Sequence, residues 1–185
     1  MNIAVYLGSS FGNDPSFKEV TAEVGTRIAR EGHTLIYGGS AMGLMGVLAD
    51  SALAEGGEVI GVEPQFFLDE GLEHPGITRT IPTETMAERK TIMMDMADAY
   101  VALPGGIGTL DEISEVAALA AIDRHGKPCV IFNKNGYYDL LGQFLDKMVT
   151  DGLLIPEGRE RIRFVESTDE MMDAIAGSGA DPERR

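Results

Sequence analysis

The residues best suited to bind an anion form the run Pro104-Gly105-Gly106-Ile107-Gly108-Thr109. The apolar residues 98–103 before it are typical of a buried strand, and the alanine-rich residues after it, to about 122, are typical of a helix. Free N–H groups and the helix dipole make the first turn of such a helix attractive to phosphate. The glycines allow close backbone approach, and Thr109 can cap the helix and donate its hydroxyl. This stretch therefore predicts a phosphate-binding turn.

Carboxylates follow the turn at helical spacing. Glu112 and Glu115 are three residues apart, in the row that begins with Thr109, so they share one face of the expected helix. Asp111 points about 100° away from Glu112. A glycine turn with an acidic helix start can also be an ordinary tight connection. The threonine and the glutamate at fixed offsets favour a ligand site, with a phosphate cradle and a carboxylate about one helical turn apart.

Two further glycine loops follow predicted strands. Gly8-Ser9-Ser10 comes after a strand at 2–7, and a ligand role and an ordinary connection are equally open for it. The run 38–46, after a strand at 33–37, holds four glycines, among them Gly39, which indicates close approach to a ligand or to a neighbouring element. It lacks the G-x-G-x-x-G pattern and the acidic residue after the next strand, so we discount NAD as a cofactor.

These loops alternate with helices along the whole chain. Further strands are expected at 58–62, 77–81, 129–132 and 162–165, and helices at 14–31, up to 55, at 84–96 after a Thr83 cap, up to 122, at 137–148 and at 169–176. Such alternation predicts an α/β fold with a parallel sheet flanked by helices on both faces. Ligands of these sheets bind at the carboxyl ends of the strands, near the switch in strand order. The loops at 8, 38 and 104 are all at carboxyl ends and are expected to form one crevice.

Residues 63–76 are expected to be irregular, as a lid or rim of this crevice that carries Glu70. His74 is interpreted as a solvated loop residue rather than as a base. Arg89 and Lys90 point about 100° apart on the next helix. One of them could face the crevice, and two solvated cations are the alternative. No group of His, Cys and carboxylate residues has metal-ligand spacing, so no metal is expected.

Length and composition bound the class of protein. The 185 residues suit one domain, which we place at 1–176, followed by a polar tail at 177–185. The formal net charge of −15 disfavours binding to nucleic acid or to an acidic membrane, and no apolar run is long enough to span a bilayer. The N-terminus lacks the features of a signal peptide. The single Cys129 lies in a strand-like run as buried filler and excludes an internal disulfide. A cytoplasmic protein without a cofactor is expected.

Several stretches together resemble one family. The run Pro104 to Glu112 matches the PGGxGTxxE signature of the LOG family, the cytokinin riboside 5′-monophosphate phosphoribohydrolases, long labelled lysine decarboxylases. Residues 5–10 resemble the opening strand and loop of that family, 37–46 its second glycine loop, and 86–90 its M-H-x-R-K helix. Lys127-Pro128 and residues 135–138 also fit, and the likeness runs from about residue 2 to residue 165. One departure is Ala87, where many members carry histidine, and it bears on substrate recognition.

The resemblance implies a Rossmann-like three-layer fold and hydrolysis of the N-glycosidic bond of a nucleoside 5′-monophosphate, AMP or an N6-modified cytokinin riboside monophosphate. It implies that Arg89 and Glu112 are the catalytic pair, to which we add Glu115, Lys90 and Glu70 as secondary candidates. It also implies a homodimer or larger homo-oligomer, with the interface near the helices that carry Arg89 and the glycine turn. The decarboxylase label finds no support, because no lysine setting argues for a pyridoxal Schiff base.

On this hypothesis the phosphate binds the N–H groups of residues 105–109. Glu112 stabilises the positive charge that develops on the ribose, and Arg89 orients Glu112 or the phosphate. The alternative is a nucleotide-binding module without turnover, such as a sensor or a molybdenum-cofactor carrier. Both readings use the phosphate cradle, and only hydrolysis needs Arg89 and Glu112 together.

Overall fold

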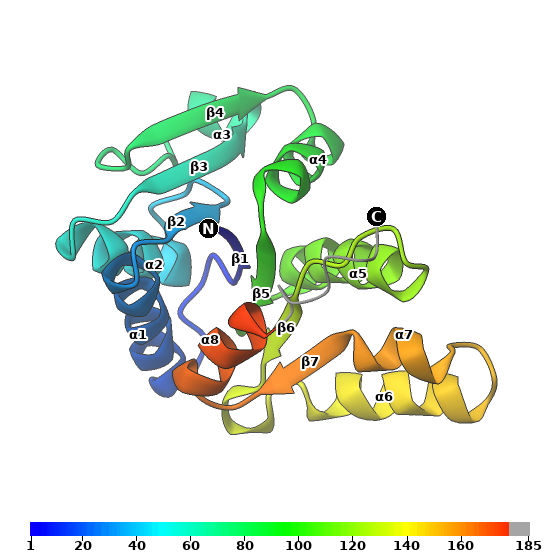
Figure 1. Ribbon diagram of the computed structural model, residues 1–185. Helices are drawn as coiled ribbons and strands as arrows, with labels where there is room; N and C mark the ends of the chain where they lie inside the picture. The colour runs from blue at the N-terminus through cyan, green and yellow to red at the C-terminus, as the bar shows by residue number, and fades with distance from the viewer. Residues whose placement is uncertain (178–185) are drawn as a thin grey trace.

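The computed structural model describes residues 1–177, and within that range seven strands form one parallel sheet in the order β4-β3-β2-β1-β5-β6-β7 (Figure 1). The strands are β1 (Asn2–Tyr6), β2 (Thr34–Tyr37), β3 (Val59–Pro64), β4 (Arg79–Thr83), β5 (Ala99–Ala102), β6 (Cys129–Phe132) and β7 (Ile162–Val165). The helices are α1 (Ser16–Arg30), α2 (Gly43–Ala54), α3 (Gln65–Asp69), α4 (Met86–Met96), α5 (Ile107–Ala121), the 3₁₀ turn η1 (Lys134–Gly136), α6 (Asp139–Thr150), α7 (Pro156–Glu160) and α8 (Thr168–Ala176).

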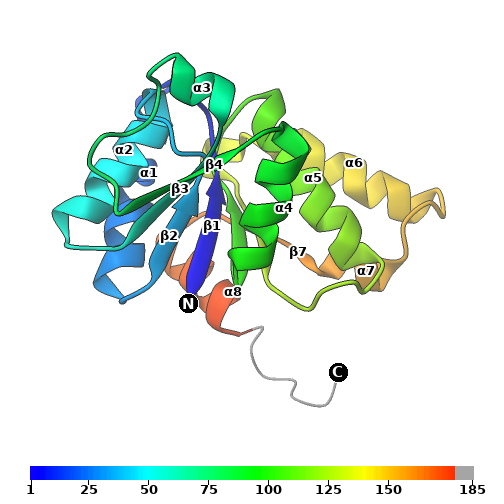
Figure 2. The same ribbon diagram turned by 90° about the horizontal axis from the view of Figure 1, so that it is seen from above.

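Helices cover both faces of the sheet. Along β1, Ile3 and Val5 pack with α1, α2 and α8, whereas Ala4 and Tyr6 pack on the other face, toward α4 and α5. This alternation places α1 and α2 on the opposite side of β1 from α4 and α5 (Figure 2). The predicted α/β fold with three layers is confirmed, and Cys129 is buried in β6 as expected.

The strand order reverses at β1, which lies between β2 and β5. Loops that leave neighbouring strands on either side of such a switch frame a crevice at the carboxyl ends. Here the loops after β1 and β5 touch, because Gly8 N donates a hydrogen bond of 3.2 Å to Pro104 O. The loop after β2 joins them, since a Cβ on Gly43 would lie only 2.2 Å from Ser9 O. The predicted meeting of the three glycine loops is confirmed.

The start of α4 differs from the prediction. The pairing of β4 with β3 continues to Thr83, opposite Pro64, so Thr83 ends a strand and does not cap the helix. The cap is Thr85, whose hydroxyl accepts a hydrogen bond of 3.1 Å from Glu88 N. The strand expected at 77–81 lies at 79–83, two residues later. The ends of an edge strand depend on its pairing with the neighbouring strand, here β3, and the local sequence does not reveal that pairing.

The segment predicted as irregular, 63–76, is partly regular. Glu63 and Pro64 complete β3, and residues 65–69 form the short helix α3. The interpretation of His74 as a solvated residue is wrong: the ring is buried, and its Nε2 lies 3.1 Å from Asp50 Oδ1 on α2. His74 is therefore held against a helix and does not line the crevice described below.

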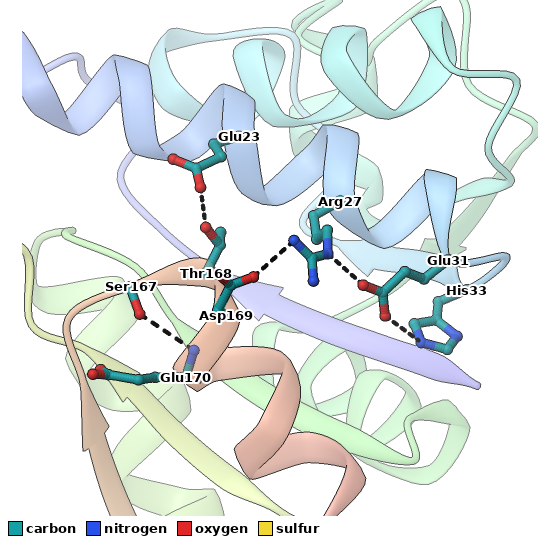
Figure 3. A network of polar contacts seen from close by, with 8 residues as sticks. All are labelled: Glu23, Arg27, Glu31, His33, Ser167, Thr168, Asp169 and Glu170. Carbon is teal, nitrogen blue, oxygen red and sulfur yellow. Dashed lines mark hydrogen bonds and ion pairs between the residues drawn. The ribbon is translucent and has the colours of Figure 1, made fainter.

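A network of polar contacts joins the last helix to the first (Figure 3). Arg27 of α1 pairs with Asp169 of α8 at 2.9 Å and with Glu31 on its own helix, and Thr168 donates to Glu23. These contacts hold α8, which follows the edge strand β7, against α1, although the two helices lie at opposite ends of the chain.

Of the tail predicted at 177–185, only Gly177 belongs to the described residues, so the boundary at 176 stays a prediction. None of the helices in residues 1–177 has both the length and the apolar character that crossing a bilayer requires. Within the same residues, no group of three or more histidine, cysteine or acidic side chains is arranged to hold a metal ion.

Candidate active site

A cavity of about 470 Å³ opens at the carboxyl ends of the strands, at the switch between β1 and β5. Its polar side chains come from the loops after β1 and β2, from the end of β3, and from α4 and α5. The remaining lining is backbone and apolar side chains. The lining residues are Leu7, Gly8, Ser9, Gly38, Ser40, Met42, Met45, Glu63, Phe67, Leu72, Met86, Arg89, Gly106, Ile107, Gly108, Thr109 and Glu112.

One wall of the cavity is the start of α5. The helix begins at Ile107 with Gly106 as its cap residue, so Thr109 lies inside the first turn and does not cap it as predicted. The first backbone hydrogen bond of the helix runs from Leu110 N to Gly106 O, at 3.1 Å. The N–H groups before Leu110 have no partner within the helix. They remain available to an anion, together with the positive end of the helix dipole.

Thr109 and Gly105 shape this turn further. The Thr109 hydroxyl oxygen is buried without a hydrogen-bond partner among the described residues. A Cβ on Gly105 would lie 2.1 Å from that oxygen, so only glycine fits there. A buried hydroxyl without a partner is costly, and an oxygen-rich ligand in the cavity would satisfy it.

Arg89 and Glu112 meet inside the cavity. Arg89 Nη1 lies 2.9 Å from Glu112 Oε1, and both side chains are buried. Arg89 Nε also donates to Val62 O at 3.0 Å, which anchors the guanidinium to β3. Burial raises the pKa of the Glu112 carboxyl, and the Arg89 charge opposes that rise. The pair combines an oriented carboxyl group with a fixed cation at the centre of the crevice.

Lys90 and Glu115, both predicted as secondary site residues, lie elsewhere. Lys90 Nζ is 2.9 Å from Asp111 Oδ2 and 2.9 Å from Glu115 Oε2, and neither Lys90 nor Glu115 lines the cavity. These ion pairs link α4 to α5 and hold the two helices that carry the buried pair. Glu112 and Glu115 both face α4, as their spacing predicts, but Glu115 lies one turn further along α5 and is therefore outside the cavity.

The other predicted site residues do not all lie in this cavity. Gly8 and Ser9 line the cavity, whereas Ser10 lines a neighbouring hollow of about 480 Å³ that also contains Gly105 and shares Gly8 and Ser9. Gly39, with φ +91°, is absent from the lining, and a Cβ on it would lie 2.9 Å from Glu63 Oε2. Glu70 is exposed at the end of α3 and contributes nothing to the lining, so its prediction is wrong.

Glu63 is the lining residue that the sequence analysis missed. Its side chain is 1% exposed, and neither carboxyl oxygen has a hydrogen-bond partner among the described residues. Burial raises the pKa of Glu63 to about 7. The signal was present in the sequence, because Glu63 directly follows the strand expected at 58–62, at the carboxyl end where ligands bind. The statement that no acidic residue follows that strand is therefore wrong, and only the absence of the G-x-G-x-x-G pattern still argues against NAD.

Known proteins resemble this chain over most of its length. A family profile described as "Possible lysine decarboxylase" matches residues 45–175. A cytokinin riboside 5′-monophosphate phosphoribohydrolase of Rhodococcoides fascians is 37% identical over 163 residues, which cover 87% of this chain and 82% of that protein. The Arabidopsis thaliana protein LOG1, which carries the same name, is 36% identical over 94% of this chain and 81% of its own length. The chain belongs to the LOG family.

As a member of the LOG family, the chain is an enzyme of the N-glycosyl hydrolase class. The decarboxylase description of the profile does not suit the cavity, since its described lining includes no lysine. Ala87, the departure from the family motif, is exposed on the first turn of α4 and does not line the cavity either.

Solved structures of other proteins share the LOG-family fold. A molybdenum cofactor carrier protein from Chlamydomonas reinhardtii superposes with a TM-score of 0.71 at 22% identity, covering 97% of this chain and 98% of its own. A molybdenum cofactor binding protein from Rippkaea orientalis superposes with a TM-score of 0.71 at 21% identity, covering 95% of each chain. At this identity the likeness concerns the fold alone.

Proposed function

We propose that this enzyme hydrolyses the N-glycosidic bond of a nucleoside 5′-monophosphate, AMP or an N6-modified cytokinin riboside monophosphate, to a free base and ribose 5-phosphate. The observation that carries the proposal is the buried contact between Arg89 and Glu112, 2.9 Å long, in the same cavity as the anion-binding start of α5. The names of the relatives support the choice of substrate class.

The phosphate is placed on the free N–H groups at Ile107, Gly108 and Thr109, with the unpartnered hydroxyl of Thr109 donating to a phosphate oxygen. This leaves the ribose over Glu112, one helical turn further along α5. When the bond from C1′ to the base nitrogen breaks, its electron pair leaves with the base, and positive charge develops on the ribose. The Glu112 carboxylate stabilises that charge and accepts a proton from the water whose oxygen bonds to C1′. A proton ends on the base nitrogen that received the electron pair, so the products are the neutral base and ribose 5-phosphate, and Glu112 returns to its carboxylate form.

Arg89 keeps Glu112 in place for this step. Its guanidinium contacts a backbone carbonyl of β3 and the carboxylate of α5 at once, which requires a planar fork of donors. The positive charge also holds Glu112 toward its ionised form against the effect of burial.

The direct test is chromatographic detection of base released from AMP and from N6-isopentenyl-AMP. Replacing Glu112 by Gln is expected to lower kcat by at least about 100-fold, because the amide neither accepts the proton nor neutralises the ribose charge. Glu115→Gln is the matched control: it makes the same change one turn along α5, outside the cavity, and is expected to leave kcat within about two-fold. Equal rates in wild type and Glu112→Gln would remove Glu112 from the mechanism.

Binding of a nucleotide without turnover is the second candidate. The molybdenum cofactor proteins share the fold, and a carrier needs the phosphate cradle but not a buried pair of arginine and glutamate. Tight binding of AMP with no release of base by wild-type protein would favour this candidate.

We also propose that the enzyme is a homodimer or larger homo-oligomer that acts in the cytoplasm. The LOG-family resemblance supports an interface near α4 and α5. The single, buried Cys129, with no disulfide, suits a reducing compartment.

A further inference from the structure

The cavity contains a second acidic group that the proposed hydrolysis does not use. Glu63 is buried, and neither of its carboxyl oxygens has a partner, although Arg89 lies close enough to lower its pKa. The hydrogen bonds of Arg89 go instead to Val62 O and to Glu112. A buried carboxyl group without donors is unfavourable, so a ligand that brings its own donors would fit this position.

The location of Glu63 indicates which part of a nucleotide lies beside it. The phosphate cradle follows β5, whereas Glu63 ends β3, and β2 and β1 lie between those two strands. Three steps of roughly 4.8 Å separate β3 from β5. Phosphate and base are the two ends of a nucleotide, so a phosphate held at α5 and a ribose held at Glu112 direct the base toward β3.

The surroundings of Glu63 suit a heterocycle. Phe67 and Leu72, from the segment after β3, line the cavity together with Met86. Gly39 packs directly against the Glu63 carboxyl group, since a Cβ there would lie 2.9 Å from Glu63 Oε2. Apolar side chains can pack on the faces of a ring, and a single carboxyl group can then read its polar edge.

We propose that Glu63 recognises the base of the substrate by accepting a hydrogen bond from its exocyclic amino group, and that it thereby selects an unsubstituted amino group over an N6-prenylated one. The inference rests on the proposed function for the placement of the phosphate. An unsubstituted amino group offers two N–H donors to the carboxyl group. A prenylated one offers a single donor and brings an apolar chain against a polar group, which leaves an oxygen without a partner.

The test measures binding in a Glu112→Gln background, so that substrates stay intact. Isothermal titration calorimetry compares AMP, purine riboside 5′-monophosphate, which lacks the amino group, and N6-isopentenyl-AMP. We expect AMP to bind about 10- to 100-fold more tightly than either of the others. Adding Glu63→Leu is expected to abolish this preference, mainly by lowering the affinity for AMP. Adding Glu63→Gln, which keeps an acceptor oxygen, is expected to retain most of the preference.

Equal affinities for AMP and purine riboside 5′-monophosphate overturn the proposal, and so does a loss that Glu63→Leu imposes equally on all three nucleotides. Glu63→Met, with a flexible side chain of similar length, replaces Glu63→Leu if the latter does not fold. The binding preference is read without turnover. If wild type releases no base from any nucleotide yet prefers AMP through Glu63, the proposed hydrolysis fails and the role of Glu63 stands.

Discussion

Arg89 shows how much a single side chain does in this crevice. Its guanidinium contacts Val62 O on β3 at 3.0 Å and Glu112 on α5 at 2.9 Å, while its backbone belongs to α4. One residue therefore ties together three elements around the cavity. Gly38 makes room for it, since a Cβ there would lie 2.2 Å from Arg89 Nη2.

Replacing Arg89 by Lys tests whether the geometry or only the charge matters. Arg89 makes its two contacts from separate nitrogens of a planar group, Nε to Val62 O and Nη1 to Glu112, and a single ammonium group does not reproduce that spacing, so Glu112 loses its orientation. We expect kcat to fall by at least about 100-fold, as measured by release of base from AMP. Lys90→Arg is the control, because Lys90 pairs with Asp111 and Glu115 outside the cavity, and its activity is expected to stay within two-fold of wild type. Full activity in Arg89→Lys would mean that charge alone suffices.

The pH dependence of stability is a second test at the residue scale. The pKa of Glu63 is about 7 in the folded protein and near 4.5 when unfolded, so the folded state binds the proton more tightly. This contribution to stability is present below pH 4.5 and is lost as the pH rises through 7, by at most about 3 kcal/mol. Burial and Glu73 raise the pKa, and Arg89 opposes them.

Urea unfolding at pH 5 and pH 8 measures the effect. The wild type is expected to lose more stability between these values than Glu63→Gln, whose amide does not titrate. Glu112 is present in both proteins, so the difference isolates Glu63. Parallel pH profiles for the two proteins would show that Glu63 titrates normally.

At the scale of elements, the cap of α4 links helix stability to activity. Thr85 accepts a hydrogen bond from Glu88 N, and Glu88 Oε2 accepts one from Glu84 N at 2.8 Å, one turn before Arg89. Residue Ser167 caps α8 in the same way, at 3.2 Å from Glu170 N, on the opposite face of the sheet from α4.

Both caps are expected to stabilise the protein by about 1 kcal/mol, so Thr85→Ala and Ser167→Ala should lower Tm by similar amounts in calorimetry. Only Thr85→Ala is expected to reduce kcat, by several-fold, because only α4 positions Arg89. A comparable loss of kcat in Ser167→Ala would show that global stability, not the local position of α4, controls the rate.

At the scale of the whole molecule, the outer face of α5 tests the proposed assembly. Leu110, Ser114 and Ala118 are exposed along one row of that helix. Sedimentation of wild-type protein is expected to give at least a dimer, and Ala118→Arg is expected to give a monomer, since it places a long cation in a close contact between copies. Leu140→Arg on α6, where Leu140 is 78% exposed, is the control and should keep the assembly. A monomeric wild type would refute the proposal.

Local patterns in the sequence were enough to predict the frame of this protein. Apolar runs broken by glycine loops identified the strands and predicted that they are parallel, because a buried strand and a βα turn are recognisable from a few neighbouring residues. The order of the strands in the sheet came only from the structure. The same local pattern located the start of α5 and its free N–H groups, although the cap residue itself was wrong.

Which side chains share the cavity was decided only by tertiary structure. Lys90 and Arg89 are adjacent in sequence, yet one pairs with Asp111 outside the cavity and the other with Glu112 inside it. The place of Glu63 at the end of a strand was visible in the sequence, but its burial beside Arg89 and Gly39 was not, since these neighbours come from α4 and from the loop after β2. The physical reason is that burial and charge pairing depend on contacts between segments far apart in sequence, and the sheet brings those segments together only when the chain folds.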